Sequence, residues 1–244
     1  MNYYGFTDKG IIRKSNQDRF LITCSKDGSL LLAAVCDGMG GASGGETASS
    51  IAVNTAESAF SDFCEKGEKV KNCGTFLTDA VSKANRSIYN VAVQTPSLEG
   101  MGTTFVGFIA CKNKITIANV GDSRAYHIRE DGITQLTTDH SLINEMIQQG
   151  SITPLEAVSH PVKNVITRAL GVEPSVKCDT YTAEIKSGEY ILLCSDGLTE
   201  AVSEPEIHFE VCTNDSVEAA CKSLADIANS RGGHDNITIV ICAF

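Results

Sequence analysis

The middle of the chain holds apolar segments that are separated by only short polar breaks. These segments are TTFVGFIAC (103–111), KITIANV (114–120), SRAYHI (123–128) and ITQLT (133–137). We interpret them as β-strands, because apolar runs of this length bounded by polar turn residues are typical of strands. Parallel neighbours need a crossover of a dozen or more residues, so connections this short require antiparallel neighbours. The sequence therefore argues against a doubly wound parallel sheet.

The rest of the chain adds strands and helices in groups. Apolar residues at three-to-four spacing predict one helix that starts near Ser43 or in the preceding glycines and reaches Phe63, and others over 75–93, 142–150 and 215–230. Further strands are predicted at 19–24, 30–36, 176–185, 190–195 and 236–244. The helices come in pairs between groups of strands, which favours an α+β architecture built on antiparallel sheets.

Composition bounds the class of protein. A chain of 244 residues without linkers or repeats is expected to form one domain, residues 1–244. Its net charge of −10 does not suit a nucleic acid or an anionic membrane as partner. The ten cysteines include no Cys-x-x-Cys pair and no zinc spacing. With no apolar leader at the N-terminus and no spanning run, we expect a cytoplasmic protein and a monomer.

Four aspartates stand at the ends of predicted strands: Asp37, Asp122, Asp196 and Asp235. If the strands at 30–36 and 190–195 run antiparallel to 236–244, then Asp37, Asp196 and Asp235 meet at one rim. Clustered carboxylates stay ionised together only when a cation lies between them. An oxygen-only ligand set predicts a hard ion, Mg²⁺ or Mn²⁺. The alternative is that each aspartate is a solvated turn residue.

The segment VCDGMGGASGGETAS (35–49) places five glycines directly after Asp37. Gly38 has no Cβ, so its carbonyl can approach an ion closely, and the other glycines let the chain turn into a helix. A nucleotide-binding loop fits poorly, because the segment lacks Gly-Lys-Ser/Thr and G-x-G-x-x-G. Near the N-terminus, Arg13 precedes a polar turn, and an Arg fork matches two phosphate oxygens. The alternative for Arg13 is a surface ion pair.

Eight short motifs follow one another in the order typical of one enzyme family. They are R-K-S-N-Q-D (13–18), V-C-D-G-M-G-G (35–41), M-G-T-T (101–104), N-V-G-D-S-R-A-Y (119–126), L-T-T-D-H-S (136–141), I-T-R-A-L-G (166–171), C-S-D-G-L (194–198) and H-D-N-I-T (234–238). On these motifs the chain resembles the metal-dependent serine/threonine protein phosphatases of type 2C, especially their single-domain bacterial members.

The resemblance implies a fold and a site. The fold would be a central antiparallel β-sandwich with pairs of helices on both outer faces, in four αββα layers. By this resemblance, Asp37 would bridge two ions, the Gly38 carbonyl would complete the coordination of one of them, and Asp196 and Asp235 would bind the other. Asp122, together with Asp196, would bind a third and weaker ion. Asp18 would act through water, and Arg13 would hold the substrate phosphate. Residues 141–165 would form a flap beside the active site.

The resemblance also implies an activity, which is hydrolysis of phosphoserine and phosphothreonine in proteins by direct attack of a metal-bridging hydroxide. The expected setting is reversal of a bacterial serine/threonine kinase. Met39 departs from eukaryotic relatives, which place a histidine acid there, and Ala42 departs from many bacterial relatives. We assign no catalytic role to His140, His160 or His234.

Two other functions stay open from the sequence. One is an inactive scaffold that binds phosphoproteins, which the intact Asp37, Asp196, Asp235 and Arg13 disfavour. The other is a regulatory phosphatase for one dedicated partner, and such members typically carry a sensor domain for which this chain has no room.

Overall fold

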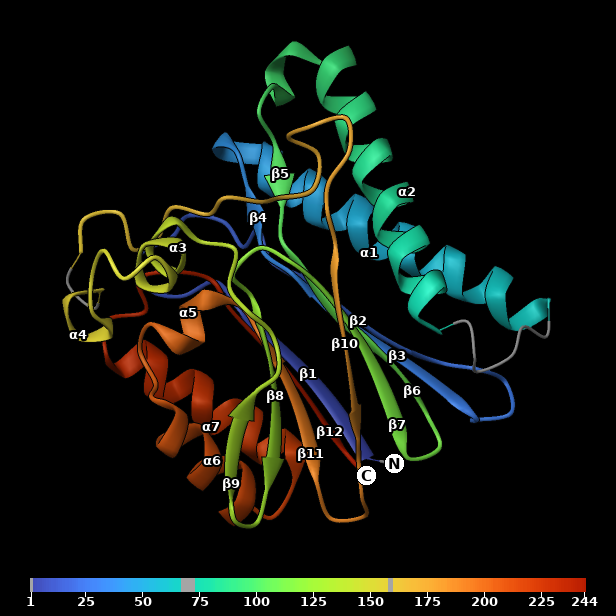
Figure 1. Cartoon of the computed structure of the whole chain (residues 1–244), viewed down its shortest axis with the longest axis vertical. Coiled ribbons are helices and arrows are strands. Elements are labelled where there is room, and N and C mark those ends of the chain that lie inside the picture. The colour runs from blue at the N-terminus through green and yellow to red at the C-terminus, as the bar shows by residue number, and fades with distance from the viewer. Residues whose placement is uncertain (1, 67–72, 158–159) are drawn as a thin grey trace.

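Two antiparallel sheets of five strands each lie face to face in the computed structural model of the chain (Figure 1). The description covers residues 2–66, 73–157 and 160–244, without the side chain of Ala42. The first sheet has the strand order β1 (Asn2–Asp8), β12 (Ile237–Ala243), β11 (Tyr190–Cys194), β8 (Arg124–Arg129) and β9 (Gly132–Gln135). The second has the order β10 (Asp179–Glu184), β7 (Lys114–Val120), β6 (Phe105–Cys111), β3 (Leu30–Cys36) and β2 (Arg19–Cys24).

Helices cover the outer face of each sheet. Helices α1 (Gly41–Glu65) and α2 (Cys73–Gln94) pack on the second sheet, and α6 (Glu204–Thr213) and α7 (Val217–Ser230) pack on the first (Figure 1). The shorter elements are β4 (Gly38–Met39), β5 (Gly102–Thr103), η2 (Pro96–Leu98), α3 (Leu142–Gln148), α4 (Pro154–Ala157) and α5 (Asp196–Thr199). The predicted α+β fold, an antiparallel sandwich between helix pairs, is confirmed.

The core consists of three apolar layers, and strand β3 shows why. Leu32 and Ala34 face α1 and α2, whereas Leu31 and Val35 belong to the layer between the two sheets, with Val240 of β12. Successive side chains of a strand point to opposite faces, so β3 is buried on both sides. This double burial explains its continuous apolar run.

Two of the longer elements were not expected from the sequence. Strand β1 forms the edge of the first sheet, where it pairs with β12 along its whole length, from Asn2 opposite Ala243 to Asp8 opposite Ile237. Helix α6 begins with a capping box between Ser203 and Glu206. The predicted strand at 103–111 is divided at Thr104, and its first residues pair with β4 rather than with the sheet.

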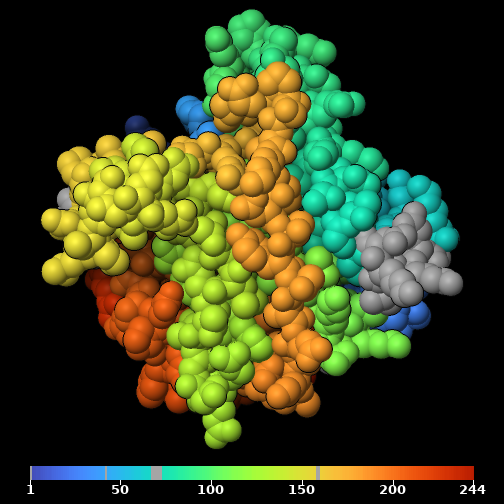
Figure 2. Space-filling view, in the orientation of Figure 1, coloured from blue at the N-terminus to red at the C-terminus, as the bar shows by residue number. Residues whose placement is uncertain are grey.

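The predicted flap, 141–165, contains α3 and α4. It stands at the side of the two sheets as the yellow body in Figure 2, next to the orange segment that leads to β10. Residues 158 and 159 of the flap lie outside the described residues. None of the helices in the described ranges combines the length and the apolar character that crossing a bilayer requires.

Candidate metal centre

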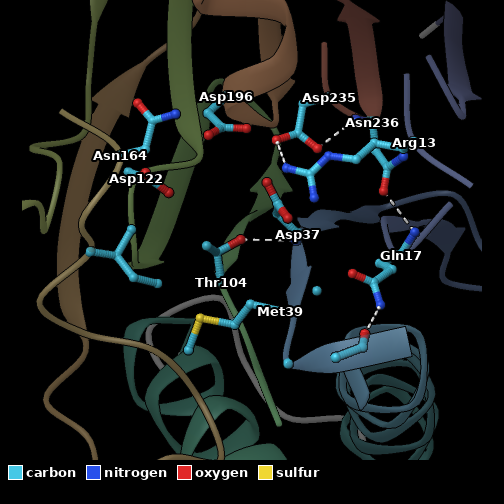
Figure 3. Close-up of a pocket in the computed structure, with 14 residues that line it drawn as sticks. Arg13, Gln17, Asp37, Met39, Thr104, Asp122, Asn164, Asp196, Asp235 and Asn236 are labelled. Carbon is cyan, nitrogen blue, oxygen red and sulfur yellow. Dashed lines mark hydrogen bonds and ion pairs between the residues drawn. The ribbon is translucent and has the colours of Figure 1, made fainter. Parts of the chain in front are cut away.

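A cavity of about 440 Å³ opens at one end of the sandwich, and the four predicted aspartates line it (Figure 3). Asp37 follows β3, Asp122 follows β7, Asp196 begins α5 directly after β11, and Asp235 precedes β12. The cavity is also lined by Arg13, which comes from the loop between β1 and β2. The structure therefore brings together residues that are up to 222 positions apart in the chain.

The route by which Asp37 reaches this cavity differs from the prediction. Strand β11 does run antiparallel to β12, as expected, but β3 belongs to the other sheet and pairs with β2 and β6. Asp37 arrives because the two sheets are stacked, so that the end of β3 lies over the end of the first sheet. Its backbone is fixed there, since its N–H donates to Thr104 Oγ1 at 2.9 Å and its C=O accepts from Thr104 N at 2.8 Å.

Gly38 lines the cavity, and a close packing contact requires it to be glycine. A Cβ at Gly38 would overlap the carbonyl oxygens of Gly45, in the first turn of α1, and of Gln17. Gly40 caps α1 in the left-handed region, at φ 114°. The glycines thus let the start of α1 approach β4, a reason that differs from the predicted approach of a carbonyl to an ion.

Asp18 lies beneath the cavity and is completely buried, with an exposed fraction of 0%. Its Oδ2 accepts a hydrogen bond from Ser195 Oγ at 2.7 Å, whereas its Oδ1 has no partner. Burial raises the pKa of Asp18 to about 6, against the lowering effect of hydrogen bonds from Ser195 and Thr238. A buried carboxylate oxygen without a partner is costly unless a cation or a water contacts it.

Burial also disfavours the charged form of Asp37, Asp122 and Asp196. Burial, and then repulsion by neighbouring carboxylates, raises the pKa of Asp37 and of Asp196 well above the ordinary range. Burial and the Asp139 carboxylate raise the pKa of Asp122 to about 6. Asp196 Oδ1 is buried without a hydrogen-bond partner. Such an oxygen-only, mutually repelling set fits a hard divalent cation.

The coordination could not be completed by acidic side chains alone. Within the described ranges, no group of three or more His, Cys, Asp or Glu side chains is arranged to hold one ion. Both oxygens of Asp235 accept hydrogen bonds from the protein. Its Oδ2 accepts from Arg13 at 2.6 Å, and its Oδ1 accepts from the backbone N–H of Asn236 at 2.8 Å (Figure 3). Main-chain carbonyls and water would have to supply the remaining ligands.

Arg13 lies at the edge of the cavity, where a phosphate could contact it. Its side chain is 51% exposed, and its guanidinium is paired with Asp235 at the edge of the cavity. The two alternatives for Arg13, a phosphate ligand and an ion pair, are therefore compatible, because a cation on Asp235 would compete with the guanidinium for the same oxygen.

Asn236 organises the loop that carries Arg13, although no sequence pattern pointed to this residue. Its Nδ2 donates to the carbonyls of Lys9 at 2.8 Å and Ser15 at 3.0 Å, and its Oδ1 accepts from Gln17 N at 2.8 Å. The motif H-D-N-I-T contained the residue, but only the fold shows that its amide closes this loop.

Replacing Asn236 by Ala is expected to lower the free energy of unfolding by about 2–4 kcal/mol, because three backbone groups lose their partner. Urea unfolding of the purified variant measures this. Asn164→Ala is the matched control, since Asn164 lines the same cavity but is exposed. Equal stability of the two variants would contradict the proposed role of Asn236.

A second cavity, of about 370 Å³, lies between the flap and the carboxylates of Asp122 and Asp196. It shares Asp122, Asp196 and Asn164 with the first cavity and adds Asp139 and Glu200. Met39 lines the first cavity. His140, His160 and His234, to which no catalytic role was assigned, line neither cavity.

Comparisons with known proteins agree with this geometry. Residues 13–227 match the sequence profile of the family described as Protein phosphatase 2C. The serine/threonine phosphatase stp of Listeria welshimeri is 38% identical over 237 residues, which cover 96% of this chain and 92% of that protein. The serine/threonine phosphatase of S. agalactiae superposes with a TM-score of 0.91 at 34% identity, covering 98% of each chain. The catalytic domain of the phosphatase PstP, solved in complex with two manganese ions, superposes with a TM-score of 0.85 at 31% identity, covering 98% of this chain and 96% of that one.

Proposed function

This chain belongs to the protein phosphatase 2C family, and we propose that it hydrolyses phosphoserine and phosphothreonine in proteins with divalent cations held in the carboxylate cavity. It is a serine/threonine phosphatase, as its relatives are. One observation carries the proposal for the site: buried carboxylate oxygens without partners, on Asp18 and Asp196, lie beside a cavity edged by an exposed arginine.

Within this cavity we assign two core ions and one weaker ion, of Mn²⁺ or Mg²⁺. Asp37 would bridge the core pair, with the Gly38 carbonyl on one ion and Asp196 and Asp235 on the other. Asp122 would hold the weaker ion together with Asp196. When bound, the ions supply positive charge that acidifies and orients water as the nucleophile and offsets charge on the phosphoryl oxygens. Asp18 orients water from beneath through its unpartnered Oδ1.

Arg13 would change partner during binding. Arg13 Nη2 lies 2.6 Å from Asp235 Oδ2 and forms an ion pair with it. With Asp235 bound to a cation, the guanidinium fork of Arg13 would be available to hold two phosphoryl oxygens.

Arg13→Lys is expected to reduce kcat/KM for a phosphothreonine peptide by about a hundredfold, because lysine keeps the charge but loses the fork. Manganese affinity should stay near the wild-type value. Steady-state kinetics together with calorimetric titration of Mn²⁺ separate the two effects. Arg129→Lys, at an exposed ion pair with Asp131, is the control. A variant that keeps its full kcat/KM would show that Arg13 does not bind the phosphate.

The leaving oxygen of the substrate serine or threonine must gain a proton, and residue 39 cannot donate it. The Met39 thioether lines the cavity but has no proton to donate. We propose that water in the open cavity supplies this proton.

We further propose that the enzyme acts on phosphoproteins as a cytoplasmic, single-domain monomer, and that it reverses the action of a serine/threonine kinase. The relatives named serine/threonine phosphatase support proteins phosphorylated on serine or threonine as the substrate class. The net charge of −10 argues against a nucleic acid as a partner.

The test is hydrolysis of a phosphothreonine peptide by the metal-free protein while Mn²⁺, and then Mg²⁺, is titrated. Activity that appears only with added cation supports the proposal. Activity without any cation would contradict it. Tight peptide binding without turnover at any cation concentration would favour the inactive scaffold instead.

A further inference from the structure

His140 is a buried histidine that joins three segments of the chain at the Asp122 side of the cavity. We propose that it is a positioning residue, which ties the turn carrying Asp122 to the segment by which the chain leaves the flap and thereby sets the affinity of the weaker cation. This inference rests on the proposed function, because it concerns the cation assigned to Asp122 and Asp196. The His140 side chain is 5% exposed and lines neither cavity, so its effect would be indirect.

The first link is to Gly121, the residue before Asp122. The His140 backbone N–H donates to the Gly121 carbonyl at 2.9 Å, and the Gly121 N–H donates to the ring Nδ1 of His140 at 3.0 Å. His140 is thus a partner of both polar groups of Gly121, whose carbonyl also accepts from Asn119 Nδ2 at 3.4 Å. Gly121 has φ 107°, and a Cβ there would overlap the Thr104 side chain. The direction in which Asp122 leaves this turn therefore depends on His140.

The second link is to the chain that leaves the flap. The His140 carbonyl accepts from Thr167 N at 2.8 Å, and Arg168 Nη1 lies 3.0 Å from the ring Nε2. Ile166, next to these residues, lines the metal cavity. Gly121 and the segment at 166–168 come from distant parts of the sequence, and His140 contacts both.

The third link is to β10. The ring Nε2 of His140 lies 3.2 Å from Asp179 Oδ2, and Arg168 Nη1 donates to Asp179 Oδ1 at 3.2 Å. Because Nδ1 accepts from Gly121, the proton of the neutral ring lies on Nε2 and is donated to Asp179. Burial lowers the pKa of His140, and the neighbouring Arg168 guanidinium lowers it further. The ring therefore acts as one acceptor and one donor, each with a separate task.

Two substitutions separate these tasks. Asn Oδ1 lies as many bonds from Cα as His Nδ1, so His140→Asn keeps an acceptor for Gly121. Gln Nε2 corresponds in the same way to His Nε2, so His140→Gln keeps a donor for Asp179 and leaves the Gly121 N–H without its acceptor. His127→Gln is the control for loss of a buried histidine. His127 lies in β8, and its Nε2 pairs with Glu189 Oε2 at 2.8 Å.

The measurement is calorimetric titration of each metal-free protein with Mn²⁺, after thermal unfolding has shown that each variant is folded. We expect His140→Gln to weaken the weakest Mn²⁺ site about tenfold and to leave the tighter sites unchanged. His140→Asn and His127→Gln should stay within about twofold of the wild type at every site.

Three results would overturn the proposal: an unchanged weak site in His140→Gln, an equal weakening of all sites, or a loss in His127→Gln as large as that in His140→Gln. A wild-type protein that binds only two ions would overturn it as well, while peptide hydrolysis with those two ions would leave the proposed function standing. Failure of the wild type to hydrolyse the peptide at any cation concentration would instead count against the proposed function.

Discussion

Asp37→Asn is expected to reduce metal-dependent hydrolysis of a phosphothreonine peptide by about a thousandfold or more, because the bridging carboxylate becomes a neutral amide. Asp196→Asn should have an effect of the same order, since Asp196 is assigned to both a core ion and the weaker ion. Steady-state kinetics at saturating Mn²⁺ and calorimetric Mn²⁺ titration measure both variants. We expect affinity and turnover to fall together.

These variants should nevertheless stay folded. Burial and neighbouring carboxylates raise the pKa of Asp37 and Asp196, so an uncharged amide relieves repulsion in the metal-free protein. Loss of activity with an unchanged or raised melting temperature would therefore assign the effect to chemistry rather than to unfolding. Asp131→Asn, at an exposed turn, is the matched control. If either cavity variant kept activity and Mn²⁺ affinity, the two-ion site would be wrong.

Removal of divalent cations is expected to destabilise the protein strongly near pH 7.5 and only weakly near pH 5. The folded protein raises the pKa of Asp18 and of Asp122 to about 6, from an ordinary value of 3.8. The folded state thus binds protons more tightly than the unfolded state, and stability falls as pH rises from about 4 to about 6. Above that window, a shift of about two units costs roughly 3 kcal/mol for each group.

Cations replace the missing protons, so their stabilising effect should be largest above pH 6. For a chain of this size, a loss of roughly 3 kcal/mol lowers the melting temperature by about 10 °C. Calorimetric melting curves with Mn²⁺ and with a chelator, recorded from pH 5 to pH 8, measure the difference. The neutral variant Asp18→Asn should flatten the pH dependence of the metal-free protein. Metal-free stability that increases from pH 5 to pH 7.5 would contradict this account.

Local patterns were enough to predict much of the architecture. Short connections join β6 to β7 and β8 to β9, and both pairs are antiparallel as the reach of the chain predicts. The connection from β7 to β8 is equally short, but these two strands lie in opposite sheets, so the antiparallel pairing predicted for 114–120 and 123–128 was wrong. Double burial made β3 and β12 continuous apolar runs that were easy to recognise. Strand β1 escaped prediction because it is an edge strand in which no residue is fully buried, which gives a weak apolar pattern.

The partners of the strands could not be predicted in the same way. The sequence argument supposed that β3 runs beside β12, but in the structure β3 lies in the opposite sheet and meets the end of the first sheet across the inter-sheet core. Hydrophobic patterns specify which faces are buried, but not which of several apolar faces covers them. Asp37 reached the predicted cavity even though the predicted pairing was wrong.

By itself, the sequence determined the strand-end aspartates, the glycines around Gly38 and the motifs that carry the family resemblance, because each depends on residue type and short-range spacing. Only the tertiary structure decided that Arg13 pairs with Asp235, that Asn236 closes the Arg13 loop, and that His140 links the Asp122 turn to the flap exit. Those contacts join residues far apart in the chain, and their geometry exists only after the two sheets have packed.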